Sequence, residues 1–403
     1  MTQGAGLERE MKIPFHRPYI TDEEIAEVID SLKSGWITMG PKTVRFENKF
    51  SRYIGSKHSI AVNSCTAALH LSLKAIDLKQ DDEVIIPTMT FTATGEVVCY
   101  FGAKPILVDV EKDTHNIDVL KIEKAITSKT KAIIPVHYAG QPCDMDEIKK
   151  IAKKNNLFVI EDAAHSLPAW YKSDKVNRRE NEKSKIGTIG DMTCFSFYAT
   201  KTLATGEGGM VTTENDEWAE KIKILRLHGI SKDAWKRYSD QGSWYYEVID
   251  AGYKYNMTDI QAALGLAQLR KVEWMWGKRN KIAEKYTAGF RDSEIIIPPH
   301  VKPDRISAWH LYVIKLNLEA LKIDRTNFIE ELKTRGIGTS VHFIPLHRHP
   351  FYKNTFGYRS KDFPNSEWIY ERIISLPIYP SMNDKDVDFV IEGITDVCKK
   401  FRR

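Results

Sequence analysis

Short apolar runs alternate with longer amphipathic stretches between residues 57 and 213 of the chain. The runs are almost continuous in apolar residues and lack strict alternation, which is typical of parallel strands that helices cover on both faces. This order predicts an α/β large domain of three layers (α/β/α) with a mostly parallel, seven-stranded sheet. The expected strands are His58–Ser64, Val84–Pro87, Pro105–Val110, Ala132–His137, Leu157–Asp162, Thr193–Phe197 and Met210–Thr213.

A second region follows a helical stretch, Gln261–Tyr286, that is rich in charge and tryptophan. It is expected to hold a strand at Trp309–Leu316, a helix at Arg325–Arg335, a second strand at Thr339–Phe343 and a final helix. We therefore expect a tail at residues 1–10, a large domain at 11–265, and a linking helix with a smaller C-terminal α+β domain at 266–403.

Two helices have especially clear patterns. Thr66 is expected to open a helix after the first strand, because apolar side chains then share one face. In the final helix apolar positions keep helical period, and Asn383 or Asp384 is placed to cap its start. The stripe residues are Leu69, Leu73 and Ile76 in the first helix, and Val387, Val390, Ile391, Ile394, Val397 and Phe401 in the second.

Composition narrows the class of protein. The chain has 403 residues, of which 42% are hydrophobic, enough for two packed domains. It has no apolar run long enough for a membrane span and no secretory signal, so we expect a soluble, cytoplasmic protein. The net charge of +5 is spread among both signs, which argues against nucleic acid as a partner. The densest charged run, Lys172–Lys185, is interpreted as a solvated loop.

The five cysteines are widely spaced and form no CxxC pair. An odd number without such pairs indicates neither a disulfide framework nor a zinc site. We expect free, mostly buried thiols and no metal site.

The first candidate for chemistry is the turn Ser64-Cys65-Thr66-Ala67 at the start of a predicted helix. Hydroxyls and free backbone N–H groups at a helix N-terminus can bind a phosphate. Ser and Thr at this position are more often simple caps, so the turn alone does not identify a ligand.

The second candidate is Asp162, which ends a strongly apolar strand and is followed closely by His165. In an open α/β sheet ligands bind outside the carboxyl ends of the strands. A carboxylate there could keep a pyridine nitrogen protonated and so make the ring an electron sink. An acid that caps the next helix or pairs with a base explains Asp162 equally well.

The third candidate is Lys201, which lies between a Ser-bearing apolar strand and a turn with Gly206, Gly208 and Gly209. A lysine becomes a usable nucleophile when apolar surroundings or a nearby cation lower the pKa of its amine. By itself such a lysine is usually a surface charge. Taken in order, an anion site, a strand-end Asp and this lysine describe a pyridoxal phosphate (PLP) enzyme, and no dinucleotide or P-loop fingerprint competes with that interpretation.

At these residues the chain resembles the DegT/DnrJ/EryC1/StrS sugar aminotransferases, a branch of the fold-type I PLP-dependent transferases. The resemblance runs from about Ile13 to the C-terminus. The motifs that carry it include Asn63-Ser-Cys-Thr-Ala-Ala68, Glu161-Asp-Ala-Ala-His165, Phe195-Ser-Phe197, Gly206-Glu-Gly-Gly209, Gly252-Tyr-Lys-Tyr-Asn256, Gly338-Thr-Ser-Val-His-Phe343 and Ser375-Leu-Pro-Ile-Tyr-Pro380.

The resemblance implies roles for residues that would hold PLP. Lys201 would be the catalytic lysine that forms the Schiff base and moves the proton, and Asp162 would pair with the pyridinium nitrogen. The remaining implied cofactor contacts are Thr66, Ala67 and Ser196 to the phosphate, Phe91 on the ring, His165 at the 3-hydroxyl, and Asn256 to the phosphate of a neighbouring subunit. The resemblance therefore also implies a homodimer with shared active sites.

The details are most similar to enzymes acting on UDP-linked 4-keto sugars, such as those making UDP-4-amino-4-deoxy-arabinose or UDP-4-amino-6-deoxyhexoses. This implies transfer of an amino group from L-glutamate to a keto carbon, expected to be C4, in surface-polysaccharide (lipopolysaccharide) or glycan biosynthesis. Candidate residues for the nucleotide sugar are Tyr198, Arg226, His228, Lys254 and His342. Tyr198 departs from the His that UDP-sugar relatives often have.

Several alternatives remain at this point. The 3-dehydratases of the family carry His where this chain has Lys201, so amine transfer is favoured over dehydration. Other interpretations also remain open. The substrate could be a dTDP- or GDP-linked keto sugar, and the aminated carbon could be C3. The chain could also be a PLP enzyme for small amino acids or a non-catalytic regulatory or binding protein. A DNA-binding regulator would need a helix with clustered Arg and Lys, which the sequence does not show.

Overall fold

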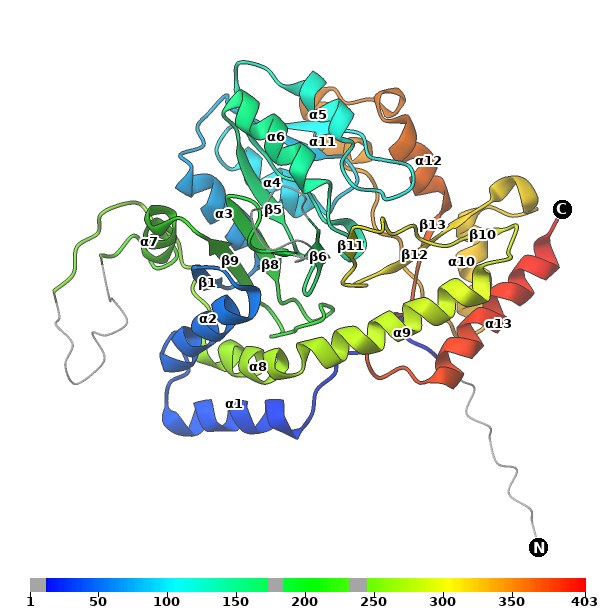
Figure 1. The fold of residues 1–403 in the computed structure, drawn as a ribbon, viewed down its shortest axis with the longest axis horizontal. Helices are drawn as coiled ribbons and strands as arrows, with labels where there is room; N and C mark the ends of the chain where they lie inside the picture. Colours follow the sequence, from blue (N-terminus) through cyan, green and yellow to red (C-terminus); the bar gives the residue numbers. More distant parts are fainter. Residues whose placement is uncertain (1–11, 173–183, 232–244) are drawn as a thin grey trace, which may run out of the picture.

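The computed structural model describes residues 12–172, 184–231 and 245–403 of the chain (Figure 1). The expected tail at residues 1–10 lies outside the described residues, and so does most of the charged run Lys172–Lys185. At the end of that run the loop prediction is wrong, because Ser184–Lys185 forms strand β7 against β6, Trp170–Tyr171.

All seven predicted strands of the large sheet are confirmed, as is the mostly parallel α/β arrangement. The sheet has the order β1-β9-β8-β5-β4-β2-β3. Neighbouring strands are parallel except at β9, which runs antiparallel to both β1 and β8. The strands are β1 His58–Val62, β9 Gly209–Thr213, β8 Met192–Ser196, β5 Phe158–Asp162, β4 Thr130–Ile133, β2 Glu83–Pro87 and β3 Lys104–Val108.

Both faces of this sheet are buried, as the continuous apolar runs predicted. Ile85 of β2 packs in one core, while its neighbours Val84 and Ile86 pack in another. Successive side chains of a strand point to opposite faces, so the two cores lie on the two sides of the sheet. Strand β4 ends earlier than predicted, at Ile133, but Val136 still forms a single parallel bridge with Asp162.

Helices cover the two faces of the sheet (Figure 1). Helix α2 packs against α8 and β1, and α1 packs against α8. Helices α3, α4 and α7 contribute buried side chains to the second core. The helices of this part are α1 Asp22–Ser34, α2 Pro41–Ile54, α3 Cys65–Ala75, α4 Thr92–Cys99, α5 Val119–Ala125, η1 Tyr138–Gly140, α6 Met145–Asn155, α7 Asp216–Leu225 and α8 Asp259–Arg270.

The C-terminal part is built on a small antiparallel sheet with the order β10-β12-β13. Helix α9 runs along one side of it with α13 packed beside it (Figure 1). Its elements are α9 Val272–Phe290, β10 Ile296–Ile297, β11 Arg305–Ile306, β12 Tyr312–Leu316, η3 Leu318–Ala320, α10 Arg325–Thr334, η4 Leu346–Arg348, α11 Pro350–Phe356, η5 Ser360–Asp362, α12 Pro364–Arg372, β13 Ile373–Leu376 and α13 Asp384–Phe401. None of the helices in the described ranges is both long and apolar enough to span a bilayer.

Two predictions for this region need correction. The strand expected at Thr339–Phe343 is reduced to one bridge between Ser340 and Ser375, since the chain then leaves the sheet. The helical stretch Gln261–Tyr286 is two helices, α8 and α9, with a break at Lys271. The final helix is confirmed, and Asn383 is its cap, accepting from the N–H groups of Lys385 and Asp386. The proposed division between residues 265 and 266 stays a prediction.

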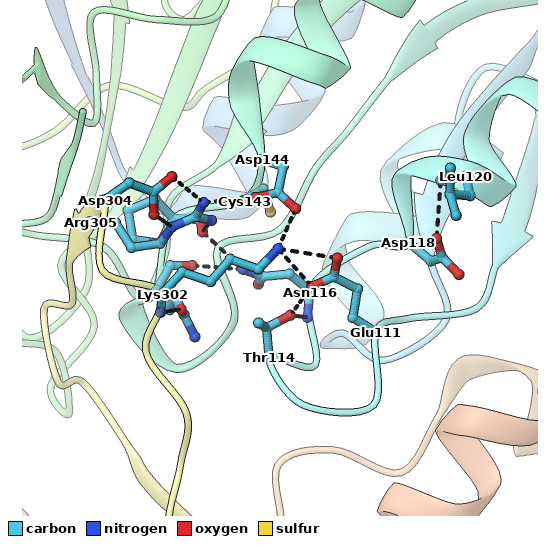
Figure 2. Close-up of polar contacts among 12 residues, drawn as sticks. Glu111, Thr114, Asn116, Asp118, Leu120, Cys143, Asp144, Lys302, Asp304 and Arg305 are labelled. Carbon is cyan, nitrogen blue, oxygen red and sulfur yellow. Dashed lines mark hydrogen bonds and ion pairs between the residues drawn. The ribbon is translucent and has the colours of Figure 1, made fainter. Parts of the chain in front are cut away.

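An ion-pair network joins the segment before β12 to loops of the large sheet (Figure 2). The Lys302 ammonium donates to Asp144 at 2.6 Å and to Glu111 at 3.2 Å. Arg305 donates to Asp144 at 2.7 Å and to the carbonyl of Pro142 at 2.7 Å. These ion pairs and hydrogen bonds fix the path of the chain a few residues before it reaches the cavity described below.

A buried carboxylate from a distant part of the sequence caps α2. Asp259 is fully buried and accepts from the backbone N–H groups of Gly40 (2.8 Å), Lys42 (2.9 Å) and Thr43 (2.9 Å). It also accepts from the Thr43 hydroxyl at 2.7 Å. A negative charge here satisfies the free N–H groups and favours the helix dipole. One side chain at the start of α8 therefore ties α8 to the start of α2.

Replacing Asp259 by Asn should destabilise the protein, because an amide has one acceptor oxygen where the carboxylate has two and carries no charge. We expect a loss of about 1–3 kcal/mol, typical of buried hydrogen bonds to a charged group. The urea midpoint at fixed protein concentration measures it. Asp396→Asn on the exposed face of α13 is the control and should change stability by less than about 0.5 kcal/mol. Equal midpoints for the two variants would contradict the capping role.

Candidate active site

A cavity of about 530 Å³ lies at the carboxyl ends of the sheet strands. The turn after β1, the last residues of β5 and β8, and the loop after β8 all line it. Most of the residues predicted for cofactor and substrate are brought together here, which agrees with the rule that ligands bind outside the carboxyl ends of parallel strands. Those that line it are Thr66, Phe91, Asp162, His165, Ser196, Tyr198, Lys201 and His342.

The antiparallel strand β9 brings three of these segments into contact. Its first residue, Gly209, is paired with Val62 at the end of β1 and with Ser196 at the end of β8. A β-carbon on Gly209 would lie 2.4 Å from the carbonyl oxygen of Ser64. Only glycine permits this close approach, so the turn at the start of α3 lies directly beside the end of β8.

Lys201 reaches the cavity from a tight loop between β8 and β9. Its backbone N–H donates to the carbonyl of Tyr198 at 2.8 Å. The N–H of Phe197 donates to the carbonyl of Gly208, and the carbonyl of Phe197 accepts from the N–H of Thr205, at 2.8 Å each. Gly206 has φ +80°, a conformation that glycine adopts without strain. The glycine-rich motif thus serves to fold the loop back so that the lysine faces the sheet.

The amine of Lys201 is desolvated. Burial lowers its pKa to about 8, and the charge of Arg279 adds to this, while Cys65 and Asp162 act in the opposite direction. Its Nζ lies 3.3 Å from Nε2 of His310. A far larger fraction of this amine is therefore unprotonated near neutral pH than of an ordinary lysine.

Asp162 is the last residue of β5, and its carboxyl group points into the same cavity. Oδ2 accepts from the Thr94 hydroxyl at 2.8 Å, and Oδ1 accepts from the backbone N–H of Ala164 at 3.1 Å. Burial raises the pKa of Asp162, against the opposite effect of these donors and of Lys201. A carboxyl group in this state favours a cationic N–H partner such as a pyridinium.

His165 presents an unsatisfied ring nitrogen. Its Nδ1 is buried and has no hydrogen-bond partner among the described residues. The ring packs against His310, with centroids 4.4 Å apart, and stacks on Phe343 at 5.8 Å. Burial holds the pKa of His165 well below its usual value, so the ring is neutral. An orphaned polar atom in a cavity indicates a ligand group that hydrogen-bonds there.

The start of α3 offers the anion site that the sequence predicted. Ser64 is the N-cap, and its hydroxyl accepts from the backbone N–H of Ala67 at 3.0 Å. The N–H of Ala67 is thus already engaged by the cap, whereas Cys65 and Thr66 line the cavity in the first helical turn, where N–H groups have no intrahelical partner. Ser196 lines the same side. Phosphate, pyridinium and phenolic oxygen each find a matching group, so the residues fit PLP.

Five predicted residues do not line the cavity of the single chain: Ala67, Arg226, His228, Lys254 and Asn256. Arg226 is buried and donates to Glu47 and, at 2.7 Å, to the carbonyl of Ala61, so its charge is used inside the fold. Lys254 donates to the side chain of Asn256 at 2.6 Å. His228 is exposed on the turn that pairs with this segment. The roles predicted for these residues stay predictions.

Several cavity residues were not predicted from the sequence, among them His16, His310 and Phe343. His16, before α1, contacts the carbonyl of Ala199 through Nε2 at 3.2 Å. His310 precedes β12, and Phe343 stacks on His165 and lies 6.0 Å from Phe91. Phe343 ends the motif Gly338-Thr-Ser-Val-His-Phe343, although no role was predicted for it. His310 lies in the apolar run around Trp309, and His16 is remote from any motif of the large sheet.

Comparison with known proteins agrees with this geometry. The pattern of the DegT/DnrJ/EryC1/StrS aminotransferase family matches residues 18–395. A protein of Methanocaldococcus jannaschii with no assigned function is 61% identical over 394 residues, 98% of this chain and 100% of that protein. The spore coat polysaccharide biosynthesis protein SpsC of Bacillus subtilis is 50% identical, over 96% of this chain and 97% of SpsC.

Solved structures match the whole fold as well. Spr1654 of Streptococcus pneumoniae in its PLP form is 36% identical with a TM-score of 0.88, over 97% of this chain and 99% of that one. Its PMP form matches with the same TM-score. Helicobacter pylori PseC, an aminotransferase of pseudoaminic acid biosynthesis, is 29% identical with a TM-score of 0.87, over 97% of this chain and 100% of PseC. The fold is that of the fold-type I PLP transferases; the chain belongs to the DegT/DnrJ/EryC1/StrS aminotransferase family, and its cofactor is pyridoxal 5′-phosphate.

Proposed function

We propose that this protein transfers the amino group of L-glutamate to the keto carbon, C4, of a UDP-linked keto-deoxy sugar. The observation that carries the proposal is the Lys201 amine, desolvated and facing the cavity that also holds Asp162. SpsC and PseC, which are named for polysaccharide and sugar-acid biosynthesis, support a sugar acceptor and a role in surface-polysaccharide or glycan synthesis. A cytoplasmic location is part of the proposal.

The residues divide into binding and proton-transfer roles. When bound, PLP supplies an electron sink through its protonated pyridine ring. Asp162 would hold that ring nitrogen protonated, His165 would bind the 3-hydroxyl through Nδ1, and the N–H groups at Thr66 with the Ser196 hydroxyl would hold the phosphate. Lys201 would bind the cofactor covalently and, as a free amine, accept and return a proton at Nζ.

The mouth of the cavity supplies surfaces for the sugar and for the cofactor ring. Phe91 and Tyr198 are 59% and 46% exposed, and both line the cavity. We propose that Phe91 covers the face of the ring and that Tyr198 and His342 contact the sugar. The Nδ1 of His342 is engaged with Ser375 at 2.8 Å, which leaves Nε2 of a neutral ring for a ligand.

A homodimer is part of the proposal. Val248 and Ile249 are 64% and 58% exposed, shortly before the segment with Lys254 and Asn256. Exposed apolar side chains near an exposed lysine that is bonded to a buried asparagine are suited to a second subunit. Asn256 would reach the phosphate site of the partner, and Lys254, which is bonded to it, would add positive charge near the diphosphate.

Lys201→Ala should remove both the cofactor link and the proton carrier. The variant should lack the visible absorbance of the wild type, and borohydride treatment should leave no phosphopyridoxyl group on the peptide containing residue 201. Turnover should fall by at least about 10²-fold, the low end for a positioned proton-transfer group. Lys57→Ala, on the surface with an ion pair to Asp216, serves as the control. Normal turnover by Lys201→Ala would refute the assigned role.

The lowered pKa of Lys201 has a direct consequence for pH dependence. Covalent capture of PLP by the cofactor-free chain needs the neutral amine, so its rate should rise about tenfold per pH unit at low pH. The rise should end near pH 8, the value to which burial lowers the Lys201 pKa. Nα-acetyl-lysine, followed in parallel, should continue to accelerate to about pH 10 and corrects for titration of PLP itself. A protein profile that also breaks near 10 would show that the amine is not desolvated.

The acceptor is tested with a panel of UDP-, dTDP- and GDP-linked keto sugars and with L-glutamate as donor. We expect kcat/KM for the UDP sugar to exceed that for the other nucleotides by at least about tenfold. NMR of the product should show the new amine on C4. Plain keto acids are the control for an amino-acid aminotransferase. Preference for a dTDP- or GDP-linked sugar, or amination at C3, would contradict the proposed substrate or position but not the proposed class of reaction.

A further inference from the structure

His310 is in direct contact with the amine of Lys201. Its side chain lines the cavity, is 6% exposed, and places Nε2 3.3 Å from Nζ. No motif of the large sheet contains it, since it lies just before β12 in the C-terminal part. The two residues are 109 positions apart in the sequence.

The backbone that carries His310 is held from behind. Arg279 of α9 is buried and donates to the carbonyl of His310 at 3.3 Å, to that of Trp309 at 3.4 Å and to that of Ile378 at 2.6 Å. The imidazole ring lies against His165, with centroids 4.4 Å apart and planes 41° apart. Because its backbone is held by Arg279 and its ring packs against His165, His310 can hold a flexible partner without large entropic cost of its own.

The surroundings keep His310 neutral. Lys201, His165, Arg279 and His342 face it, and together with burial they hold the pKa of His310 well below its usual value. A neutral imidazole has one N–H and one acceptor nitrogen. The amine or ammonium of Lys201 always has an N–H to donate, so Nε2 is suited to accept it and Nδ1 then carries the proton. Nδ1 is buried without a partner in the described residues, as is Nδ1 of His165.

We propose that His310 is a positioning residue for Lys201, whose Nε2 accepts a hydrogen bond from Nζ whenever the amine is not bonded to the cofactor. The proposal depends on the role proposed above for Lys201. With one N–H of the neutral amine directed at His310, the lone pair and the other N–H of Nζ are left for the cavity. This hydrogen bond restricts the four side-chain torsions of the lysine before the reaction. Orienting a reacting group in advance lowers the activation barrier.

Two substitutions separate the acceptor from the volume of the ring. His310→Gln keeps an acceptor oxygen near the position of Nε2, whereas His310→Leu fills similar space without one. His300→Leu, an exposed histidine outside the cavity, is the control. Thermal unfolding midpoints and bound PLP content establish that each full-length variant is folded and loaded.

The first readout is covalent capture of PLP by the cofactor-free chain at saturating PLP, followed by visible absorbance. The maximal rate reports on Nζ, and the half-saturating concentration reports on PLP binding. For His310→Leu we expect the rate to fall about 10- to 100-fold, the effect of misplacing a reacting group. The half-saturating concentration should stay near that of the wild type, and His310→Gln should recover most of the rate.

The second readout is the glutamate half-reaction of the loaded enzyme in a single turnover. The maximal rate should fall in His310→Leu and be restored in His310→Gln, with the glutamate concentration for half-saturation unchanged. A wild-type capture rate in His310→Leu would overturn the proposal. The proposal would also be overturned if both variants lost the same fraction of the rate and this loss matched their loss of bound PLP. That result would show that His310 has a packing role only. Failure of the wild type itself to react with glutamate would instead contradict the proposed function.

Discussion

The close approach of Gly209 to the backbone of Ser64 is the constraint on which the site depends. It lets β9 run antiparallel between β1 and β8, and so aligns the ends of both strands. The start of α3, the Ser196 end of β8 and the loop with Lys201 are then forced to one edge of the sheet. A side chain at residue 209 would collide with the Ser64 carbonyl and separate the anion site from the lysine.

Desolvation is the second shared constraint, and it acts on the lysine, the aspartate and the histidines of the cavity. Burial lowers the pKa of Lys201 and of the histidines around it and raises that of Asp162, so each group shifts toward its neutral form. The buried guanidinium of Arg279 adds positive potential behind the site, where it is hydrogen-bonded to carbonyl oxygens. In each case burial disfavours the charged form, and such a cavity is suited to a cofactor with both anionic and cationic groups.

The sequence was sufficient for the large sheet and for bringing most of the predicted site residues to the cavity. Its strands are apolar on both faces, and the cofactor motifs follow strand ends, so local pattern and position in the sheet agree. It was insufficient where a contact joins distant segments. Asp259 capping α2 and His310 touching Lys201 bring together residues far apart in the chain, and no local period records them. The predicted strand Thr339–Phe343 was wrong for a related reason: Phe343 lines the cavity and stacks on His165.

This difference follows the division of labour in the fold. Most of the groups proposed to bind PLP lie on or next to the large sheet, whose geometry is common to many aminotransferases and is visible in motifs. Of the groups proposed to contact the sugar nucleotide, Tyr198 follows β8, whereas His342 and Lys254 lie on segments outside the large sheet. Side chains on such segments are constrained by tertiary contacts and not by helical or strand period. The reaction class is therefore far more accessible from this sequence than the sugar, because the two properties depend on different parts of the chain.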